Sequence, residues 1–109
     1  MKWEFIYYSS RVKQNLLSLP KELLAEYYAM QQIMEEKGPS LGMPYTRAMG
    51  DGLFEMRLSD KDGIARVFYC TIEKYEIFVL HSFVKKTRVT PDRELQLARK
   101  RLKEVKQHG

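Results

Sequence analysis

The chain has 109 residues, 44% hydrophobic and 30% charged, as in an ordinary globular protein. This length suits one hydrophobic core, and we expect residues 1–109 to form a single domain. No apolar run reaches the about 20 residues of a membrane span, and the segment from Met1 to Tyr8 lacks the features of a signal peptide. The single cysteine, Cys70, excludes an internal disulfide, so we expect a buried thiol in a reducing cytoplasm.

The positive charge is confined to the second half of the chain. Residues 1–52 carry six Lys/Arg and six Asp/Glu, whereas residues 53–109 carry thirteen and eight, so the whole net charge of +5 lies there. Such an excess favours an anionic partner such as nucleic acid, although a basic protein is also simply soluble.

The chain begins with a predicted strand and a short predicted helix. Residues 3–8 are rich in aromatic and β-branched side chains, which is typical of a strand. Ser9 or Ser10 can cap a short helix over residues 11–17. Pro20 suits the first turn of a longer helix, where its missing N–H would be unpaired in any case.

The longer helix carries an apolar stripe that predicts a core-facing side. The stripe consists of Leu23, Tyr27, Met30 and Met34, with Leu24 and Ile33 widening it. Gly38 and Pro39 end the helix, because glycine accepts a left-handed cap and proline cannot continue the helix. Residues 40–52 have no strong period and are interpreted as a loop.

The second half predicts three strands and a C-terminal helix. The strands span residues 53–58, 64–72 and 76–84, joined by an Asp62-Gly63 turn and a weaker Lys74-Tyr75 turn. Thr90 can cap and Pro91 can open the helix, whose narrow apolar seam is Leu95, Ala98, Leu102 and Val105. The sequence thus predicts an α+β fold in the order β-α-α-β-β-β-α. In it, a small antiparallel sheet has N-terminal helices packed on one face and a C-terminal helix.

Alternation along the strands predicts a cationic face. In one strand, the residues that would share a face are Ile64, Arg66, Phe68 and Cys70. In the next strand they are Ile77, Val79, His81, Phe83 and Lys85. Arg57 points away from Phe54 and Met56. Such a face would be an RNA platform, because cations hold phosphates and aromatic rings stack on unpaired bases. The alternative is that the arginines pair across strands with Glu55, Glu73 or Glu76.

The residues allow RNA cleavage without a cofactor. Two histidines and one cysteine form no familiar metal-ligand spacing, and the chain has no phosphate-binding loop and no nucleophile elbow. RNA supplies its own nucleophile, the ribose 2′-OH, which the protein must orient and deprotonate while stabilising charge on the phosphate. Arginine suits the last task. His81 would transfer protons near neutral pH, although a lone strand histidine is more often structural.

Three motifs and two further residues together carry a resemblance to a known family. They are Gly52-Leu-Phe-Glu-Met-Arg57, Arg66-Val-Phe-Tyr69 and Val79-Leu-His-Ser-Phe-Val-Lys-Lys-Thr-Arg-Val-Thr-Pro91, followed by Glu94 and Ala98. Over residues 1–106, and most specifically over 52–98, the chain resembles the phage-derived HigB-type branch of the RelE/ParE toxin superfamily. Each motif alone would be weak.

The resemblance implies the toxin of a type II toxin–antitoxin pair. Toxins of the HigB type cleave mRNA in the ribosomal A site during translation, without a metal. A small helix-turn-helix antitoxin usually inhibits them in a hetero-oligomer. The implied partners are therefore mRNA, the ribosome with its RNA, and a cognate antitoxin, with no membrane and no cofactor. A cytoplasmic location is implied as well.

The resemblance also carries over site residues. It places Arg66 and Lys85 or Lys86 in the active site, with Arg57 and His81 lining the same surface, and it leaves the general base unassigned. The full expected set is Arg66, Lys85, Lys86 and His81 for catalysis and Arg57, Phe83, Arg88, Arg99, Lys100 and Lys103 for RNA binding. Two other functions stay open: a ParE-like inhibitor of DNA gyrase without enzymatic activity, and an inactive RNA-binding regulator.

Overall fold

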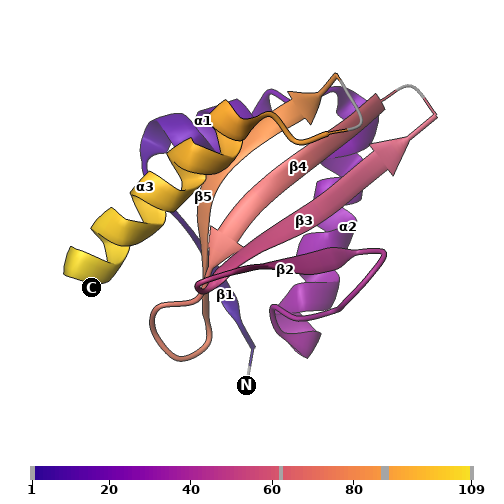
Figure 1. Cartoon of the computed structure of the whole chain (residues 1–109). Coiled ribbons are helices and arrows are strands. Elements are labelled where there is room, and N and C mark those ends of the chain that lie inside the picture. The colour runs from indigo at the N-terminus through magenta and orange to yellow at the C-terminus, as the bar shows by residue number, and fades with distance from the viewer. Residues whose placement is uncertain (1, 62, 87–88, 109) are drawn as a thin grey trace.

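The fold is a five-stranded sheet with three helices (Figure 1). The structure is a computed structural model, and it describes residues 2–61, 63–86 and 89–108. The elements are β1 (Glu4–Tyr7), α1 (Ser10–Leu17), α2 (Lys21–Lys37), β2 (Thr46–Gly50), β3 (Leu53–Asp60), β4 (Gly63–Cys70), β5 (Glu76–Lys85) and α3 (Asp92–His108). The predicted α+β class and the predicted order of strands and helices are confirmed, with one strand, β2, added.

The strands lie in the order β1-β5-β4-β3-β2. The pairs β2–β3, β3–β4 and β4–β5 are antiparallel, so the predicted meander is confirmed. The first strand returns to the far edge and runs parallel to β5. Parallel strands need a long connection, and here the chain between β1 and β5 runs through two helices and three strands.

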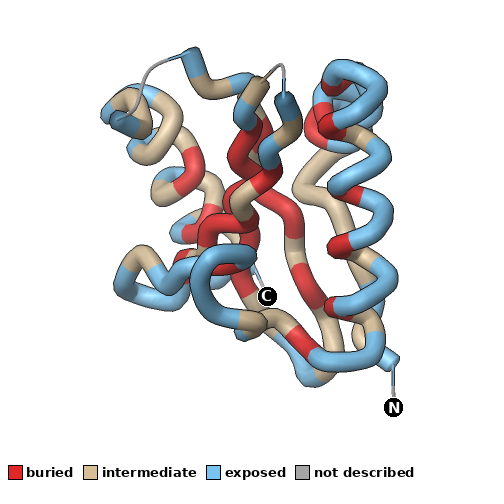
Figure 2. Tube along the Cα trace, turned by 90° about the vertical axis from the view of Figure 1, so that its right-hand side faces the viewer, coloured by how far each residue is buried: buried red, intermediate tan, exposed pale blue. Residues whose placement is uncertain are grey.

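Helices cover both faces of the sheet, and the buried positions concentrate in the strands between them (Figure 2). On one face, α1 and α2 bury a core against Met56, Leu58 and Val67 of the central strands. On the other face, α3 buries Ala98 and Leu102 in a smaller cluster with Leu53, Phe68, Cys70 and Leu80. The C-terminal helix therefore covers part of the sheet face on which the strand alternation predicts the cationic side chains.

Local signals explain the ends of the first two helices. Ser9 is the N-cap of α1, and its Oγ accepts a hydrogen bond from the Val12 N–H at 3.1 Å. Gly38 ends α2 with a φ of 94°, a conformation that favours glycine. The stripe of Leu23, Tyr27, Met30 and Met34 is buried as predicted. Ile33 is 48% exposed, so its predicted place in the stripe is wrong.

The predicted loop over residues 40–52 contains the edge strand β2, and this part of the prediction is wrong. Only Thr46 of the strand is buried, so the segment shows no alternation that a sequence reading would detect. Its pairing with β3 nevertheless sets a register in which Arg47 lies opposite Glu55. A short edge strand of this kind is held by its neighbour and not by its own hydrophobic pattern.

A β-bulge in β5 corrects the predicted face of that strand. Tyr69 of β4 pairs with Val79 and Phe68 pairs with His81, so Leu80 is an extra residue on β5. Val79 therefore packs on the α1/α2 side, whereas Leu80 lies on the α3 side together with His81 and Phe83. The prediction that Ile77, Val79, His81, Phe83 and Lys85 share one face is wrong, because the bulge separates the first two from the other three.

The remaining predicted features lie at the second hairpin, the thiol and the C-terminal helix. Asp62 of the predicted Asp62-Gly63 turn is outside the described residues, and β4 begins at Gly63. Cys70 is buried, and burial raises its thiol pKa to about 11. The predicted seam of α3 packs against the sheet. No helix in the described part of the chain has the length and apolarity needed to cross a membrane.

Candidate active site

Register across the sheet sets charged and aromatic side chains in three rows on the face that α3 partly covers. The first row is Arg47, Glu55, Phe68 and His81, the second is Arg57, Arg66 and Phe83, and the third is Ser59, Ile64 and Lys85. Alternation along β3 and β4 places these residues together because side chains two apart share a face. Arg57, Arg66 and Lys85 are not members of the apolar cluster beneath α3, whereas Phe83 of the second row packs against it.

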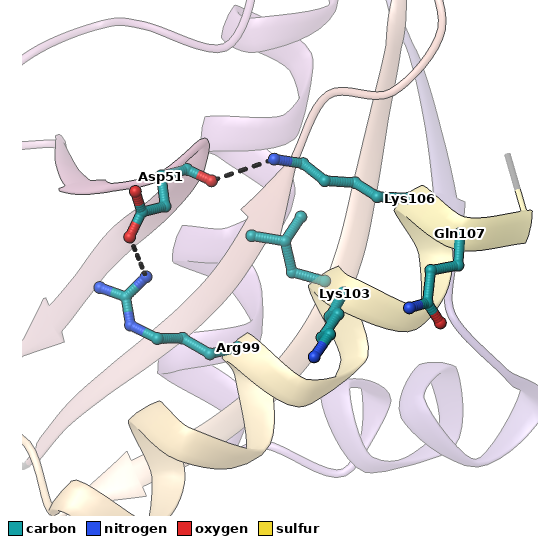
Figure 3. A pocket seen from close by; sticks show the side chains of 6 residues that line it. Asp51, Arg99, Lys103, Lys106 and Gln107 are labelled. Carbon is teal, nitrogen blue, oxygen red and sulfur yellow. Dashed lines mark hydrogen bonds and ion pairs between the residues drawn. The ribbon is translucent and has the colours of Figure 1, made fainter.

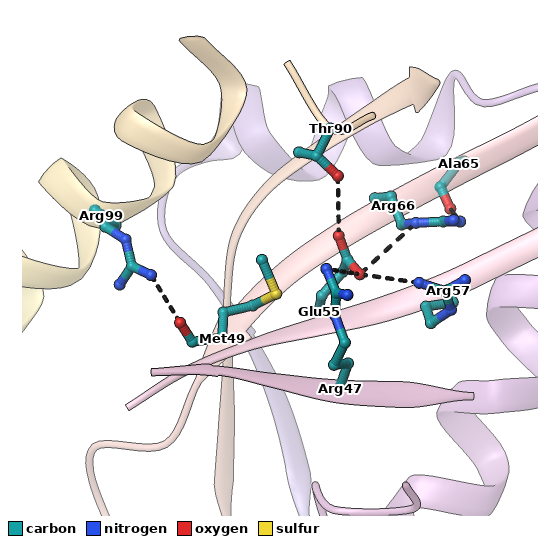
Figure 4. A network of polar contacts seen from close by, with 8 residues as sticks. All are labelled: Arg47, Met49, Glu55, Arg57, Ala65, Arg66, Thr90 and Arg99. Carbon is teal, nitrogen blue, oxygen red and sulfur yellow. Dashed lines mark hydrogen bonds and ion pairs between the residues drawn. The ribbon is translucent and has the colours of Figure 1, made fainter. Parts of the chain in front are cut away.

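Glu55 is the centre of a polar network on this face (Figure 4). Its side chain is 0% exposed, and its Oε1 lies 3.4 Å from Arg57 Nη1, 3.6 Å from Arg47 Nη2 and 3.8 Å from Arg66 Nε. Its Oε2 accepts a hydrogen bond from the Thr90 hydroxyl at 3.4 Å. The alternative prediction, that the arginines pair with a glutamate, therefore holds for Glu55. A single carboxylate, however, lies close to three guanidinium groups.

Arg66 is the most buried of the three arginines, with 6% of its side chain exposed. Its Nη1 donates a hydrogen bond to the Ala65 carbonyl at 3.1 Å, whereas its buried Nε has no hydrogen-bond partner. Burial lowers the pKa of the guanidinium, and the positive charges of Arg57 and Arg47 add to this effect against the opposing charge of Glu55. The guanidinium group is a strong hydrogen-bond donor, and a bound anion would stabilise its charged form.

A pocket of about 250 Å³ opens beside the two central arginines. It is lined by Pro44, Arg57, Ser59, Ile64 and Arg66. Four of these residues come from β3 and β4, and Pro44 comes from the segment before β2. Two arginines therefore line this pocket, and arginine is the residue type that suits the binding of a phosphate.

Lys85 ends the third row, and Lys86 follows it at the exposed end of β5. Burial lowers the pKa of Lys85, and the positive charges of Arg66, Arg57 and Arg47 lower it further, while Glu55 opposes them. A lysine with a lowered pKa is better able to exchange a proton near neutral pH. Lys85 therefore lies within the electrostatic field of the three arginines and Glu55.

His81 lies on the predicted face but is already engaged. Its Nε2 is 2.7 Å from Glu94 Oε1 of α3, and 11% of its side chain is exposed. Its ring stacks on Phe83 with the centroids 5.8 Å apart, and Phe83 in turn packs beside Phe68. His81 thus joins the C-terminal helix to the sheet, and Phe83 is half-buried within an aromatic group.

The predicted RNA-binding residues of α3 lie apart from this site. Arg99 donates hydrogen bonds to the Met49 and Gly50 carbonyls at 2.8 and 3.3 Å. Lys103 lines a separate pocket of about 380 Å³ with Arg99 (Figure 3), and Lys100 is exposed. Arg88 lies outside the described residues.

Comparison with known families identifies the chain. Residues 14–103, most of its length, match the family described as phage derived protein Gp49-like (DUF891). The chain belongs to the Gp49-like family.

The fold of this Gp49-like chain is also found among solved structures. It is similar to a chain of the archaeal RelE–RelB complex from Pyrococcus horikoshii OT3, with a TM-score of 0.56 and 20% sequence identity. The match covers 82% of this chain and 100% of that chain. At this identity the likeness shows a shared fold. No curated protein sequence matches the Gp49-like chain.

Two residues of the site were missed by sequence reasoning. Arg47 was missed because its strand was interpreted as a loop, so it had no assigned face. Glu94 was noted only as part of a motif, and the sequence gives no signal that α3 folds back to bring it to His81. The Glu55–Arg57 spacing did place both side chains on one face. Among the described residues, no three His, Cys, Asp or Glu side chains group in a way that would hold a metal.

Proposed function

We propose that this Gp49-like protein is the toxin of a type II toxin–antitoxin pair and an endoribonuclease that cuts mRNA in the ribosomal A site. A RelE-like fold and membership of a phage-derived family support this proposal. The P. horikoshii chain of the same fold was solved in complex with RelB. By analogy, we propose a helix-turn-helix antitoxin as the partner of this chain, together with mRNA and the ribosome.

One observation carries the proposal of RNA chemistry. Arg57 and Arg66 line one pocket on an open sheet face, where three guanidinium groups share a single buried carboxylate. A protein that only blocks another protein has no need of such a convergent cationic pocket. A phosphodiester supplies the negative charge that this arrangement lacks.

The proposed reaction uses the groups of this face in sequence. The 2′-oxygen attacks the phosphorus as its proton passes to a base, for which Lys85 is our candidate because its pKa is lowered. The bond from phosphorus to the 5′-oxygen then breaks, and the leaving oxygen takes a proton from water. The products are a 2′,3′-cyclic phosphate and a 5′-hydroxyl. Arg66 and Arg57 stabilise the charge that builds on the phosphate oxygens in between.

Arg66→Ala in a reconstituted translation reaction tests the proposal. We expect wild-type protein to cut the message within translated codons, and only when ribosomes are present. Arg66→Ala should slow the cleavage by about 100-fold or more, because a donor to the developing charge is lost. Mapping the message ends measures both the sites and the rate.

Arg11→Ala is the matched control, since Arg11 is exposed on α1, the helix on the opposite face of the sheet. It should leave cleavage unchanged. Intact message with wild-type protein would contradict the nuclease. In that case inhibition of DNA gyrase supercoiling would support the ParE-like alternative, and RNA binding without cleavage would support the regulator.

A further inference from the structure

The charges around Glu55 do not balance. Three guanidinium groups and one carboxylate leave a net charge of +2 in the cluster of Arg47, Arg57, Arg66 and Glu55. A buried ion pair that only stabilises a fold is matched in charge and closely hydrogen-bonded, because burial of an unmatched charge is costly. Here the three nitrogen–oxygen distances are 3.4 to 3.8 Å, so the carboxylate holds the arginines without saturating any of them.

The positive charge of the cluster lies mostly toward the surface. Arg47 has 46% and Arg57 has 28% of its side chain exposed, whereas Glu55 is fully buried beneath them. The Arg66 Nε is buried and has no hydrogen-bond partner. The cluster therefore presents its positive charge to the surface and keeps its negative charge inside the sheet.

We propose that Glu55 is a positioning residue that holds Arg47, Arg57 and Arg66 together for an RNA phosphodiester, with Arg47 as the third arginine of the site. The inference rests on the proposed function and deepens it. Arg47 comes from the edge strand β2, and its register opposite Glu55 brings its guanidinium to the same carboxylate oxygen as the other two.

The surplus charge suits the transition state better than the ground state. A phosphodiester carries one negative charge, and attack by a deprotonated 2′-oxygen raises this to two on the pentacoordinate phosphorus. The net charge of +2 in the cluster matches that dianion. A site that is complementary to the developing charge accelerates the reaction and does not merely bind the substrate.

Removal of the Glu55 charge therefore separates binding from cleavage. Glu55→Gln keeps the shape of the side chain but raises the net charge of the cluster to +3 and lets the arginines spread apart. We expect RNA to bind several-fold more tightly, because phosphate contacts gain charge. We also expect single-turnover cleavage to slow by about 100-fold, because the guanidinium groups are no longer preorganised.

The experiment measures both quantities on mRNA-programmed ribosomes. Binding is measured with a message carrying a 2′-deoxyribose at the cleaved nucleotide, which blocks the reaction, and the rate is measured with the unmodified message. Weaker binding together with slower cleavage would indicate a structural role for Glu55 and overturn the inference, as would an unchanged rate. The thermal midpoint of each variant shows whether it is folded.

Arg47→Gln is the second variant, and its half-exposed place on an edge strand makes misfolding a minor concern. We expect weaker binding and about 10-fold slower cleavage. Arg47→Lys should recover binding more than rate, since lysine keeps the charge and lacks the planar fork. Normal binding and cleavage in Arg47→Gln would overturn the role of Arg47.

A wild-type protein that does not cleave any message would contradict the proposed function, and the binding measurements would still decide the inference. Tighter RNA binding by Glu55→Gln with weaker binding by Arg47→Gln would support the proposed phosphate site. Unchanged affinity in both variants would contradict it.

Discussion

At the residue scale, Lys85 shows how the network sets the chemistry of a side chain at its edge. Burial lowers the pKa of Lys85, and Arg66, Arg57 and Arg47 lower it further through their positive charges. Glu55 is the one group that raises it among the causes of this shift. A neutral amine is thus accessible at lower pH than for a free lysine, and a neutral amine is what a proton acceptor requires.

Lys85→Arg should remove the pH dependence of cleavage while it preserves binding. In the wild type, we expect the single-turnover rate to rise with pH as Lys85 loses its proton and to level off above its lowered pKa. An arginine remains charged throughout, so the rate should be low and nearly independent of pH. Rate–pH profiles of both proteins measure this.

The same substitution at the neighbouring Lys86 separates the two lysines. Lys86→Arg should retain the wild-type profile, because Lys86 is exposed beyond the row that contains Lys85. A flat profile in Lys86→Arg and a normal one in Lys85→Arg would assign the proton transfer to the other lysine.

At the scale of elements, α3 secures the turn that precedes β3. Residues Gly50, Asp51 and Gly52 all have positive φ, and the carbonyls of Met49, Gly50 and Asp51 accept hydrogen bonds from α3. The donors are Arg99 and Lys106. The helix thereby holds the end of β2, the strand that brings Arg47 to Glu55.

Arg99→Ala should loosen β2 and leave the rest of the sheet unchanged. Its two hydrogen bonds to carbonyls would be lost, and we expect a loss of about 1–3 kcal/mol in the free energy of unfolding. Hydrogen exchange should quicken in β2 alone. Lys100→Ala, at an exposed cation one residue along the helix, should change neither. Weaker RNA binding by Arg99→Ala with normal exchange in β2 would instead support the predicted RNA contact.

The elements also show what could be predicted from the sequence. The helices and the three strands of the meander were predicted because their periodicities are strong and their ends carry Ser9, Gly38 and Pro91. Arg57 and Arg66 were predicted to share a face, since alternation along β3 and β4 is regular. Strand β2 and the bulge at Leu80 depend on pairing with a neighbour, so no local pattern reveals them.

At the scale of the whole molecule, buried tyrosines tie the stability of the fold to pH. Tyr7 and Tyr27 share a hydrogen bond of 2.8 Å between β1 and α2, and the Tyr69 hydroxyl donates to the Pro39 carbonyl. Burial raises the pKa of all three hydroxyls. In the unfolded chain a tyrosine ionises near pH 10. The contribution of these groups is therefore fully present below about pH 10 and is lost as the pH rises above it.

The free energy of unfolding should fall steeply above about pH 10. Each tyrosine that ionises only in the unfolded chain contributes a slope of about 1.4 kcal/mol per pH unit. Tyr69→Phe should remove one such contribution and flatten the decline, which urea unfolding at a series of pH values measures. Tyr45→Phe, at an exposed tyrosine, is the matched control. An unchanged slope in Tyr69→Phe would contradict the assignment.

The extra residue in β5 means that the composition of the cationic face depends on a count of residues. If β5 kept Leu80 but alternated plainly from Val79 onward, His81, Phe83 and Lys85 would turn toward α1 and α2, and Ser82 and Val84 would turn toward the arginines. The bulge therefore decides which side chains of β5 face the arginines, without any change in their identity.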